Sequence, residues 1–398
     1  MLSPPPHLPS STSSEPESYK DLRKGEISQK NPPLVRIVIV SWNVEKLLER
    51  CLRSLSDACR GLDWECVVVD NASRDNSVGA TFAVAHAIPQ IRIIQNTMNV
   101  GFGKACNQGA SDGRRGTCDA RYLLFLNPDT HVPPDSITRL VQLADERPAS
   151  GIMGPRLTYP DGRPQASIRR FPDVWNQAGI LLKAHHVFPW LRMFRLYFAR
   201  DADATREQNV EQVMGACFLV RRECWEHIGA FDERFFLWFE EVDRCKAAIE
   251  KGWNVTYLPQ VEIIHHGGES FAQEFTIQKQ RFFNDSVIAY FQKWHPGWRV
   301  MLLACVAPVS IALASLVAFF RHPSTPWIAV VIGVETFSAI VTFYPLSDSI
   351  GTVLAAIVIA ILAWKKPTIG LGLLLLELLI GSKGGLLQYG TFPHTVNG

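Results

Sequence analysis

The feature that most limits the fold is the alternation, from Leu34 to Leu126, of short continuously apolar runs with stretches of helical periodicity. The predicted strands are residues 35–40, 66–69, 91–94 and 122–126, and the predicted helices are 45–55, 78–87 and 104–111. Apolar strands separated by helices are typical of a parallel sheet buried on both faces. Ligands of such sheets bind at the carboxyl ends of the strands. The sequence therefore predicts an α/β domain with its chemistry just after the strands.

The last quarter of the chain is nearly free of charge. Residues 300–398 contain seven charged side chains, which are Arg321, Glu335, Asp348, Lys365, Lys366, Glu377 and Lys383. Residues 301–320 contain none, and a run of that length is about long enough to cross the hydrocarbon core of a bilayer. We expect three to four membrane helices within residues 300–382 and a tail over 383–398. The alternative is a helical bundle buried in water, which so little charge disfavours.

Residues 276–299 lead into this region as an amphipathic segment. It carries basic and aromatic side chains at Lys279, Arg281, Phe282, Phe283, Tyr290, Phe291, Lys293, Trp294, Trp298 and Arg299. That mixture suits a membrane interface. If three full spans follow a cytoplasmic domain, Lys365 and Lys366 fall outside, against the positive-inside tendency. Either one apolar segment lies in the interface or the number of spans differs from three.

Composition excludes several classes of function. The net charge of +2 over 398 residues provides no long basic face, so we expect no nucleic-acid partner. The nine cysteines form no Cys-x-x-Cys pair, which argues against a zinc module. Residues 1–33 contain seven prolines and seven serines and no apolar run, so we expect a disordered lead-in there.

Polar side chains follow the predicted strands. Asp70 follows the second strand and is able to accept a hydrogen bond from a pyrimidine ring N–H or a ribose hydroxyl; alternatively, it only forms a turn or caps a helix. Asp129 follows the fourth strand and is our candidate ligand for Mg²⁺ or Mn²⁺, cations that prefer oxygen; the alternative is a Pro-Asp turn. The glycines of segment 99–109 permit close backbone approach, although the segment is neither a dinucleotide nor a P-loop motif.

Two titratable clusters lie further along the chain. Glu240, Glu241 and Asp243 open a predicted helix beside aromatic residues, a setting that raises a carboxyl pKa and suits a general base. The alternative is that these acids only complement the helix dipole. His265 and His266 follow a predicted strand over 261–264, where a histidine is able to contact metal or diphosphate; the alternative is a structural pair.

In order, these motifs resemble family 2 glycosyltransferases of the GT-A fold, and most of all the bacterial rhamnosyltransferase-type group that builds cell-surface polysaccharides. The motifs are Ser-Trp-Asn (41–43), Val-Asp-Asn-Ala-Ser (69–73), Asn-x-Gly-Phe-Gly (99–103), Leu-Asn-Pro-Asp (126–129), Gly-Ala-x-x-Leu-Val-Arg-Arg (215–222), Gly-x-Phe-Asp-Glu (229–233), Glu-Glu-Val-Asp (240–243) and His-x-Gly-Gly-x-Ser (265–270). The resemblance covers roughly residues 35–296. It implies a GT-A domain over 34–275, with a mainly parallel sheet flanked by helices, ahead of the amphipathic segment 276–299 and the membrane region.

The resemblance also implies roles for residues. The nucleotide sugar would be bound by Ser41, Asn43, Asp70, Asn99, Gly101, Gly103, Asn107, Gly215 and Ala216, with Asp70 at the base. Asp129 ends a metal-binding Asp-x-Asp motif whose first position holds Asn127 here, so one direct ligand of Mg²⁺ or Mn²⁺ is expected, and His266 would meet the metal or the diphosphate. Glu241 stands where the family has its catalytic base, with the choice among Glu241, Glu240 and Asp243 left open.

The implied reaction is a single inverting displacement at the anomeric carbon. A sugar, with rhamnose favoured, would pass from a nucleotide-diphosphate donor to a lipid-linked saccharide acceptor at the bacterial inner membrane, the catalytic domain facing the cytoplasm. A processive polysaccharide synthase is one alternative, but segment 278–282 lacks the Trp of the Gln-x-x-Arg-Trp motif that such enzymes carry. A non-catalytic nucleotide-binding scaffold is another, disfavoured because the acidic residues are all present.

Overall fold

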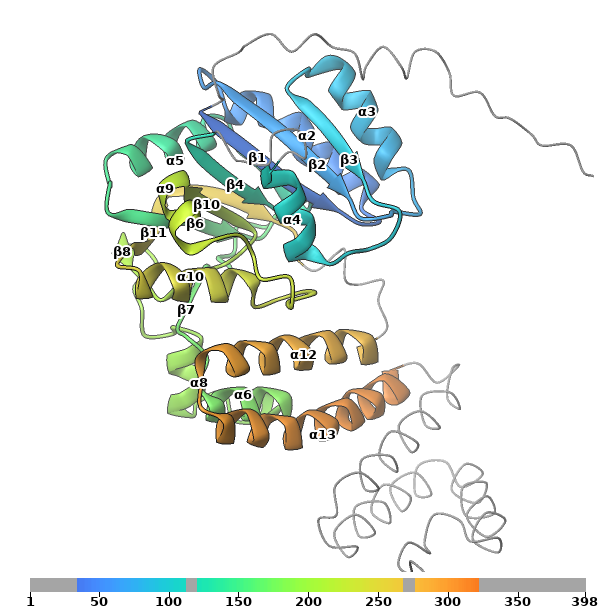
Figure 1. The fold of residues 1–398 in the computed structure, drawn as a ribbon, viewed down its shortest axis with the longest axis vertical. Helices are drawn as coiled ribbons and strands as arrows, with labels where there is room; N and C mark the ends of the chain where they lie inside the picture. The colour runs from blue at the N-terminus through green and yellow to red at the C-terminus, as the bar shows by residue number, and fades with distance from the viewer. Residues whose placement is uncertain (1–33, 112–119, 268–275, 322–398) are drawn as a thin grey trace, which may run out of the picture.

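The computed structural model describes residues 34–111, 120–267 and 276–321. The predicted lead-in, the tail and the predicted membrane helices beyond Arg321 lie outside these residues. The described part is built on a nine-stranded sheet in the order β3-β2-β1-β4-β10-β6-β11-β5, with β8 paired to β11 (Figure 1). The strands are β1 (Val35–Ser41), β2 (Trp64–Asp70), β3 (Ile91–Gln95), β4 (Tyr122–Leu126), β5 (Thr130–His131), β6 (Ser150–Thr158), β8 (Gln208–Asn209), β10 (Cys217–Arg221) and β11 (Asn254–His265). Two further strands, β7 (Ile168–Arg169) and β9 (Gln212–Val213), form a separate antiparallel pair.

The sheet is mainly parallel, as predicted. β3, β2, β1 and β4 run parallel, and β6 and β11 are parallel to each other. β10 enters between β4 and β6 antiparallel to both, so its first residues lie beside the last residues of β4. The segment that begins β10 therefore joins the strand ends at one edge of the sheet.

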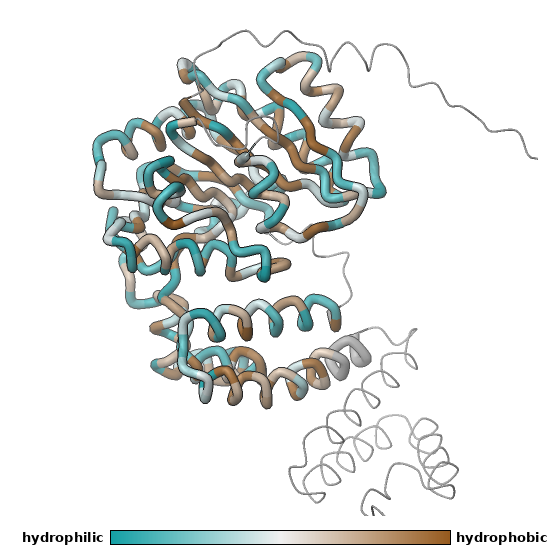
Figure 2. The backbone as a smooth tube through the Cα atoms, in the orientation of Figure 1, coloured by the Kyte–Doolittle hydropathy of each residue, from teal (hydrophilic) through white to brown (hydrophobic). Residues whose placement is uncertain are grey.

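Helices cover both faces of the sheet. They are α2 (Glu45–Ala58), α3 (Ser77–Ala87), α4 (Phe102–Ser111), α5 (Ser136–Asp145), α6 (Val174–Leu181), α7 (Ala184–Val187), α8 (Arg192–Tyr197), α9 (Arg222–Ile228), α10 (Glu240–Glu250), α12 (Thr276–Trp294) and α13 (Gly297–Arg321). Successive side chains of β1 point to opposite faces. Ile37 and Ile39 pack with α2, α3 and α5, whereas Val38 and Val40 pack with α4, α9 and α10. The continuous apolar strands of the sequence thus reflect burial on both sides, visible as the hydrophobic centre of the sheet in Figure 2.

A third apolar cluster lies below the sheet and joins α6, α12 and α13 to the start of α10. It contains the buried side chains Val174, Leu181, Phe235, Phe239, Val242, Val287, Tyr290, Phe291 and Leu303. α6 begins at a capping box, in which Asp173 accepts from the Trp175 amide at 3.0 Å and Asn176 accepts from the Asp173 amide at 3.1 Å. Within the described residues, α13 contains one segment, Gly297–Ala314, long and apolar enough to cross a membrane, with a mean hydropathy of 1.8.

Candidate active site

The predicted site residues meet at the carboxyl edge of the sheet. Ser41 at the end of β1 pairs with Asp70 at the end of β2. Leu126 at the end of β4 pairs with Cys217 at the start of β10, directly after Gly215 and Ala216. The end of β11 pairs with β5, which places His265 opposite Thr130. Strand ends separated by more than two hundred residues are thereby brought to one edge.

The loops after β1 and β2 are held together by hydrogen bonds. Asp70 is nearly buried, and its carboxylate accepts from the Ser73 hydroxyl at 2.5 Å and the Ser73 amide at 3.0 Å. The side-chain oxygen of Asn43 accepts from the backbone amide of Arg74 at 2.6 Å, and the backbone amide of Asn43 donates to the Ser73 hydroxyl at 3.0 Å. Ser41 Oγ is buried and has no hydrogen-bond partner among the described residues. Asp70 therefore does form the turn considered above, and it does so beside Ser41 and Asn43.

The glycine-containing loop before α4 packs directly on segment 229–239. Gly101 has φ +90°, and a Cβ there would lie 2.8 Å from the carbonyl oxygen of Phe236. Only glycine suits both the backbone angle and the contact. Asn99 accepts from the Gly101 amide at 3.0 Å, and Asn71 donates to the Gly101 carbonyl at 3.1 Å. The loop is thus held by a hydrogen bond from the end of β2 and by one within the loop itself.

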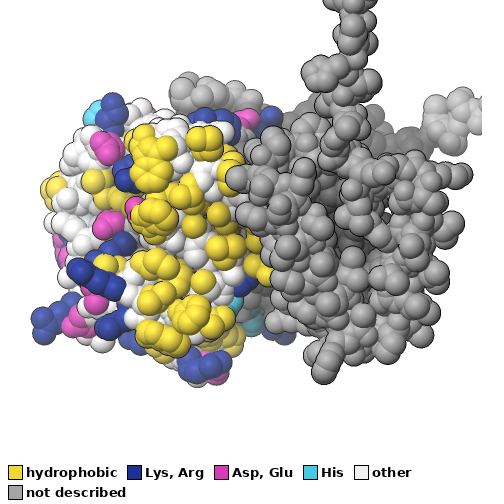
Figure 3. All heavy atoms as spheres, turned by 90° about the horizontal axis from the view of Figure 1, so that it is seen from below, with side chains coloured by type: hydrophobic (Ala, Val, Ile, Leu, Met, Phe, Trp, Pro, Cys, Tyr) yellow, Lys and Arg dark blue, Asp and Glu magenta, His cyan; other side chains and the backbone are white. Residues whose placement is uncertain are grey.

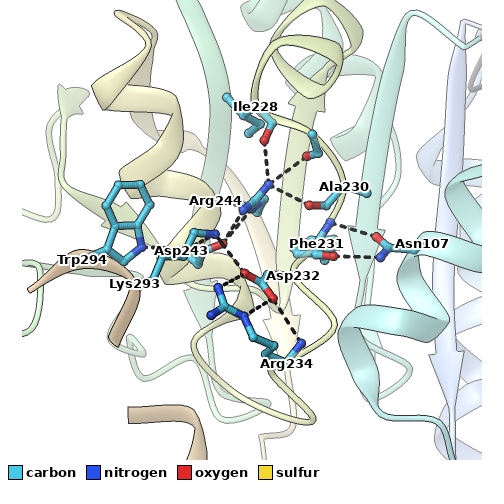
Figure 4. Close-up of polar contacts among 11 residues, drawn as sticks. Asn107, Ile228, Ala230, Phe231, Asp232, Arg234, Asp243, Arg244, Lys293 and Trp294 are labelled. Carbon is cyan, nitrogen blue, oxygen red and sulfur yellow. Dashed lines mark hydrogen bonds and ion pairs between the residues drawn. The ribbon is translucent and has the colours of Figure 1, made fainter. Parts of the chain in front are cut away.

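Gly103 and Asn107 also face segment 229–239. Asn107 donates to the Phe231 carbonyl and accepts from the Phe231 amide, both at 2.9 Å, which uses its side chain to hold that segment (Figure 4). A Cβ at Gly103 would lie 3.4 Å from the Cβ of Phe231. In this structure both residues contact segment 229–239, and both hydrogen-bonding groups of the Asn107 side chain are engaged with Phe231.

Asp129 faces a histidine, and that histidine is His265. Its Nε2 lies 3.3 Å from Asp129 Oδ1, and its Nδ1 lies 2.9 Å from Gln165 Oε1. His266 offers Asp129 only its backbone amide, which donates to the Asp129 carbonyl at 2.9 Å. The ring of His266 instead lines a surface groove of about 560 Å³ with Arg50 and His131. In this structure, therefore, His265 and not His266 has its ring beside Asp129.

The chemistry at Asp129 fits a divalent cation that shares its shell with a ligand. Asp129 is nearly buried, and the imidazole of His265 adds a second donor. Within the described residues, no group of three or more His, Cys, Asp or Glu side chains stands close enough to bind a metal alone. One carboxylate is what Mg²⁺ or Mn²⁺ requires when phosphate oxygens supply further ligands.

Glu240 and Glu241 open α10 next to this edge. Trp238 and Phe239 both have positive φ, at 64° and 69°, which produces the sharp turn into the helix. Glu241 lies against Gly215: a Cβ built on that glycine would be 3.5 Å from Glu241 Cγ and 3.6 Å from its Cδ. Gly215 thereby leaves open the space next to the carboxyl group of Glu241.

Burial controls the protonation of both glutamates. Burial, and then repulsion from Glu241, raise the pKa of Glu240 well above its usual range. Glu240 Oε2 has no hydrogen-bond partner within the described residues. Burial also raises the pKa of Glu241, opposed by its backbone hydrogen bonds and by Arg169. A carboxyl group with a raised pKa is a stronger base once it is ionised.

Asp243 has a different environment (Figure 4). It is fully buried, and Oδ1 accepts from Trp294 Nε1 and Lys293 Nζ, each at 2.8 Å. Oδ2 accepts from Arg244, whose Nη1 donates to the carbonyls of residues 228–230 at 2.7–3.0 Å. Lys293 also lies 3.1 Å from Asp232. Arg244 and Lys293 pair with both carboxylate oxygens of Asp243, a geometry that suits a structural ion pair.

Residues 36–229 match the family model described as glycosyl transferase family 2. These residues are a family 2 glycosyltransferase domain. The protein is therefore a glycosyltransferase, and its mainly parallel sheet flanked by helices is of the GT-A type expected.

Two curated relatives of this glycosyltransferase are named for polyprenyl-linked substrates. An N-acetylglucosaminyl-diphospho-decaprenol L-rhamnosyltransferase of Mycobacterium tuberculosis is 28% identical over 287 residues, which cover 70% of this chain and 91% of that protein. An undecaprenyl-phosphate 4-deoxy-4-formamido-L-arabinose transferase of Pseudomonas syringae is 32% identical over 44% of this chain and 51% of its own. Among solved structures, a mannosyltransferase from Pyrobaculum calidifontis in complex with GDP-Man and Mn²⁺ is 16% identical, with a TM-score of 0.44 and 94% of each chain covered.

Sequence reasoning missed the structural contacts of three groups in the glycosyltransferase domain and its flank. Asn71 joins the loops after β2 and β3, since it also accepts from the Val100 amide at 3.2 Å. The ring of His265, and not that of His266, lies beside Asp129. Lys293 and Trp294 on α12 pair with Asp243. Asn71 and His265 lie inside recognisable motifs, but nothing in the local sequence links Asp243 to a helix fifty residues away.

Proposed function

We propose that this glycosyltransferase inverts the anomeric centre of a nucleotide-diphosphate sugar and transfers the sugar, with rhamnose favoured, to a lipid-linked saccharide in cell-surface polysaccharide synthesis. The observation that carries the proposal is the meeting of Glu241, Gly215 and Asp129 at the carboxyl edge of the sheet. The rhamnosyltransferase relative, aligned over 91% of its length, supports the donor sugar and the lipid-linked acceptor. Acceptors of this kind favour placement at the bacterial inner membrane, with the catalytic domain on the cytoplasmic side.

The donor would bind across the loops that follow β1, β2 and β3. Asp70, held by Ser73, and the unpartnered hydroxyl of Ser41 would face the nucleoside. The backbone around Gly101 would border the diphosphate because its glycines allow close approach. Asp129 and His265 would hold Mg²⁺ or Mn²⁺, which when bound stabilises negative charge on the diphosphate.

Glu241 is the base we favour, and Glu240 is the second candidate. Glu241 lies against Gly215, where the donor sugar and acceptor would meet, and its burial keeps its basicity high. Its carboxylate would take the proton of the acceptor hydroxyl as that oxygen attacks the anomeric carbon. Asp243 would act only by holding α10 in place.

Replacing the proposed base and metal ligand tests this function. We expect Glu241→Gln and Asp129→Ala each to lower kcat by at least about 100-fold, because a general base and a metal ligand each contribute at least this much. Transfer by the wild type should fall as the pH drops through the raised pKa of Glu241, and this pH dependence should vanish in Glu241→Gln. The assay is sugar transfer by detergent-purified full-length protein across a panel of nucleotide sugars, with and without divalent metal.

A matched control is Glu250→Gln, at the exposed end of the same helix, which should retain normal turnover. Near-normal turnover of Glu241→Gln or Asp129→Ala would remove that residue from its role. The length of the product separates a single transfer from a processive synthase, because only the synthase gives a ladder of added sugars.

A further inference from the structure

The side of the molecule below α12 exposes an unusual amount of apolar surface. Of twelve large hydrophobic side chains exposed within the described residues, nine lie in α13 or in residues 175–191. They are Trp175, Leu182, Val187, Phe188, Trp190, Leu191, Trp298, Met301 and Val309. Figure 3 looks onto this side and shows a broad apolar area with basic side chains at its margin. We call these nine residues the apolar underside.

The apolar underside is formed by segments that pack on one another. Arg299 at the start of α13 lies 3.7 Å from Asp173, the N-cap of α6. Asn284 of α12 donates to the Ala307 carbonyl at 2.9 Å and accepts from the Ser310 hydroxyl at 3.0 Å. Leu303 is buried in the cluster shared by α6 and α12. α13 therefore lies along α12 and against α6 as far as Ser310 (Figure 1).

This packing conflicts with α13 crossing a bilayer on its own. α12 carries Lys279, Arg281, Asp285 and Lys293, and charged side chains are costly in hydrocarbon. A helix attached lengthwise to α12 through a buried Asn284 cannot enter the hydrocarbon without drawing those charges in. The apolar side chains of Gly297–Ala314 nevertheless leave Trp298, Met301 and Val309 exposed.

Basic residues predominate in the segments that carry the apolar underside, and Asp173 and Asp201 flank residues 174–200. Residues 174–200 contain Lys183, Arg192, Arg195 and Arg200 and no Asp or Glu. Arg192, Arg195 and Arg200 are exposed. α13 likewise has Arg299 and Arg321 and no acidic residue. Cations around exposed Trp and Phe are complementary to a membrane surface that contains anionic lipid.

We propose that the apolar underside is seated on an anionic phospholipid bilayer, with Gly297–Ala314 of α13 lying in the plane of the interface instead of crossing it. The proposal rests on the proposed function only in that a lipid-linked acceptor requires a membrane. It adds a docking face, contributed by residues 175–191 inside the glycosyltransferase domain, to the amphipathic segment 276–299.

This placement brings the membrane close to the active site. The ring of Phe282 on α12 stacks on Phe236 with centroids 4.5 Å apart, and Ser286 donates to the Leu237 carbonyl at 2.7 Å. The Phe236 carbonyl accepts from the amide of Phe102, next to the glycine loop, at 2.8 Å. α12 and the layer of α6 and α13, each about 10 Å thick, thus separate the loop bordering the site from the exposed face of the apolar underside (Figure 1). A lipid-borne acceptor would approach the site from the side of the molecule that faces the bilayer.

Nitroxide labels on the full-length protein test the contact. The background is Cys118→Ser with Cys305→Ser, because the other seven cysteines are buried. In vesicles of phosphatidylethanolamine and phosphatidylglycerol, a label at Phe188→Cys should be relaxed by oxygen and shielded from a water-soluble nickel chelate. A control label at Ile249→Cys, an exposed apolar position on α10, should show the reverse. Equal nickel access at both positions would overturn the proposal. Shielding of position 188 from both oxygen and the nickel chelate, in micelles as well as in vesicles, would also overturn it, because another segment of the chain would then cover that position.

The same labels decide the orientation of α13. Labels at Met301→Cys and Val309→Cys should lie at the same depth if the helix is in the interface plane. In a helix that crosses the bilayer, eight residues separate them in depth by about 12 Å. A depth difference of that size would overturn the in-plane placement.

Activity separates this proposal from the proposed function. In Phe188→Ser with Trp190→Ser, transfer to a lipid-linked acceptor in vesicles should fall at least about tenfold, since membrane binding scales with buried apolar area. Donor hydrolysis in detergent should be unchanged, and Ile249→Ser should resemble the wild type in both assays. Unchanged vesicle transfer in the double variant would overturn the docking face. A wild type that transfers no sugar would overturn the proposed function instead, while the label depths would still report on the membrane contact.

Discussion

Asp243 shows how the role of a single carboxylate depends on what surrounds it. Burial raises the pKa values of its sequence neighbours Glu240 and Glu241, although Arg169 opposes the shift at Glu241. Asp243 is fully buried and accepts from Arg244, Lys293 and Trp294. Carboxyl groups within four positions of one helix therefore have different surroundings, which fit a proposed proton acceptor in one case and a structural ion pair in the other.

We expect Asp243→Asn to lower the free energy of unfolding by about 3–5 kcal/mol, because it leaves the buried Arg244 without its counter-charge and removes one of the two carboxylates that pair with Lys293. Asp201→Asn, which breaks the partly exposed pair with Arg170, should cost no more than about 1 kcal/mol. Denaturant unfolding of both variants in detergent checks this. If Asp243→Asn were as stable as the wild type but lost transfer, Asp243 would return as a candidate base.

At the scale of elements, the site is made by loops that pack on one another. The glycine loop before α4, the loop after β2 and segment 229–239 share hydrogen bonds through Asn71, Asn107 and the Phe236 carbonyl. Gly101 stands where two of these loops approach most closely. The donor site depends on these contacts because its loops belong to no regular element of their own.

Gly101→Ala should therefore weaken donor binding and destabilise the fold by more than the roughly 1–2 kcal/mol that positive φ alone costs an alanine. Gly61→Ala is the matched control, since Gly61 has φ +78° and a methyl group added there would have no other atom within 4 Å. Thermal unfolding and donor KM measure both effects. Equal losses in the two variants would show that the contact with Phe236 contributes nothing.

At the scale of the whole molecule, α12 connects the sheet domain with the layer of α6 and α13. Lys293 is central to this connection, since it pairs with both Asp232 and Asp243. Arg234 and Lys293 both lower the pKa of Asp232, the hydrogen bond from Arg234 contributing most, so that carboxylate stays ionised. The position of the layer of α6 and α13 is thereby linked to segment 229–239 through α12.

Lys293→Met should loosen this connection. We expect transfer to a lipid-linked acceptor to fall about tenfold, the equivalent of roughly 1.4 kcal/mol, while donor hydrolysis changes little. Lys279→Met removes the same charge from the same helix, where no ion pair of Lys279 is found among the described residues, and should behave as the wild type. Parallel losses in both assays would indicate general destabilisation instead of a loosened link.

The sequence by itself determined the first four strands, the three helices between them and the edge where chemistry gathers, because strand and helix periodicities and strand-end polarity are local properties of the chain. It also brought Asp70, Asp129 and Glu241 forward, since each stands in a motif. Tertiary structure alone decided that His265 and not His266 faces Asp129, and that Asp243 is paired through α12. Those outcomes depend on the direction of individual side chains and on contacts between residues far apart in sequence. The apolar underside was likewise decided by tertiary structure, because residues 175–191 and α13 form one face only when α6 and α13 pack together.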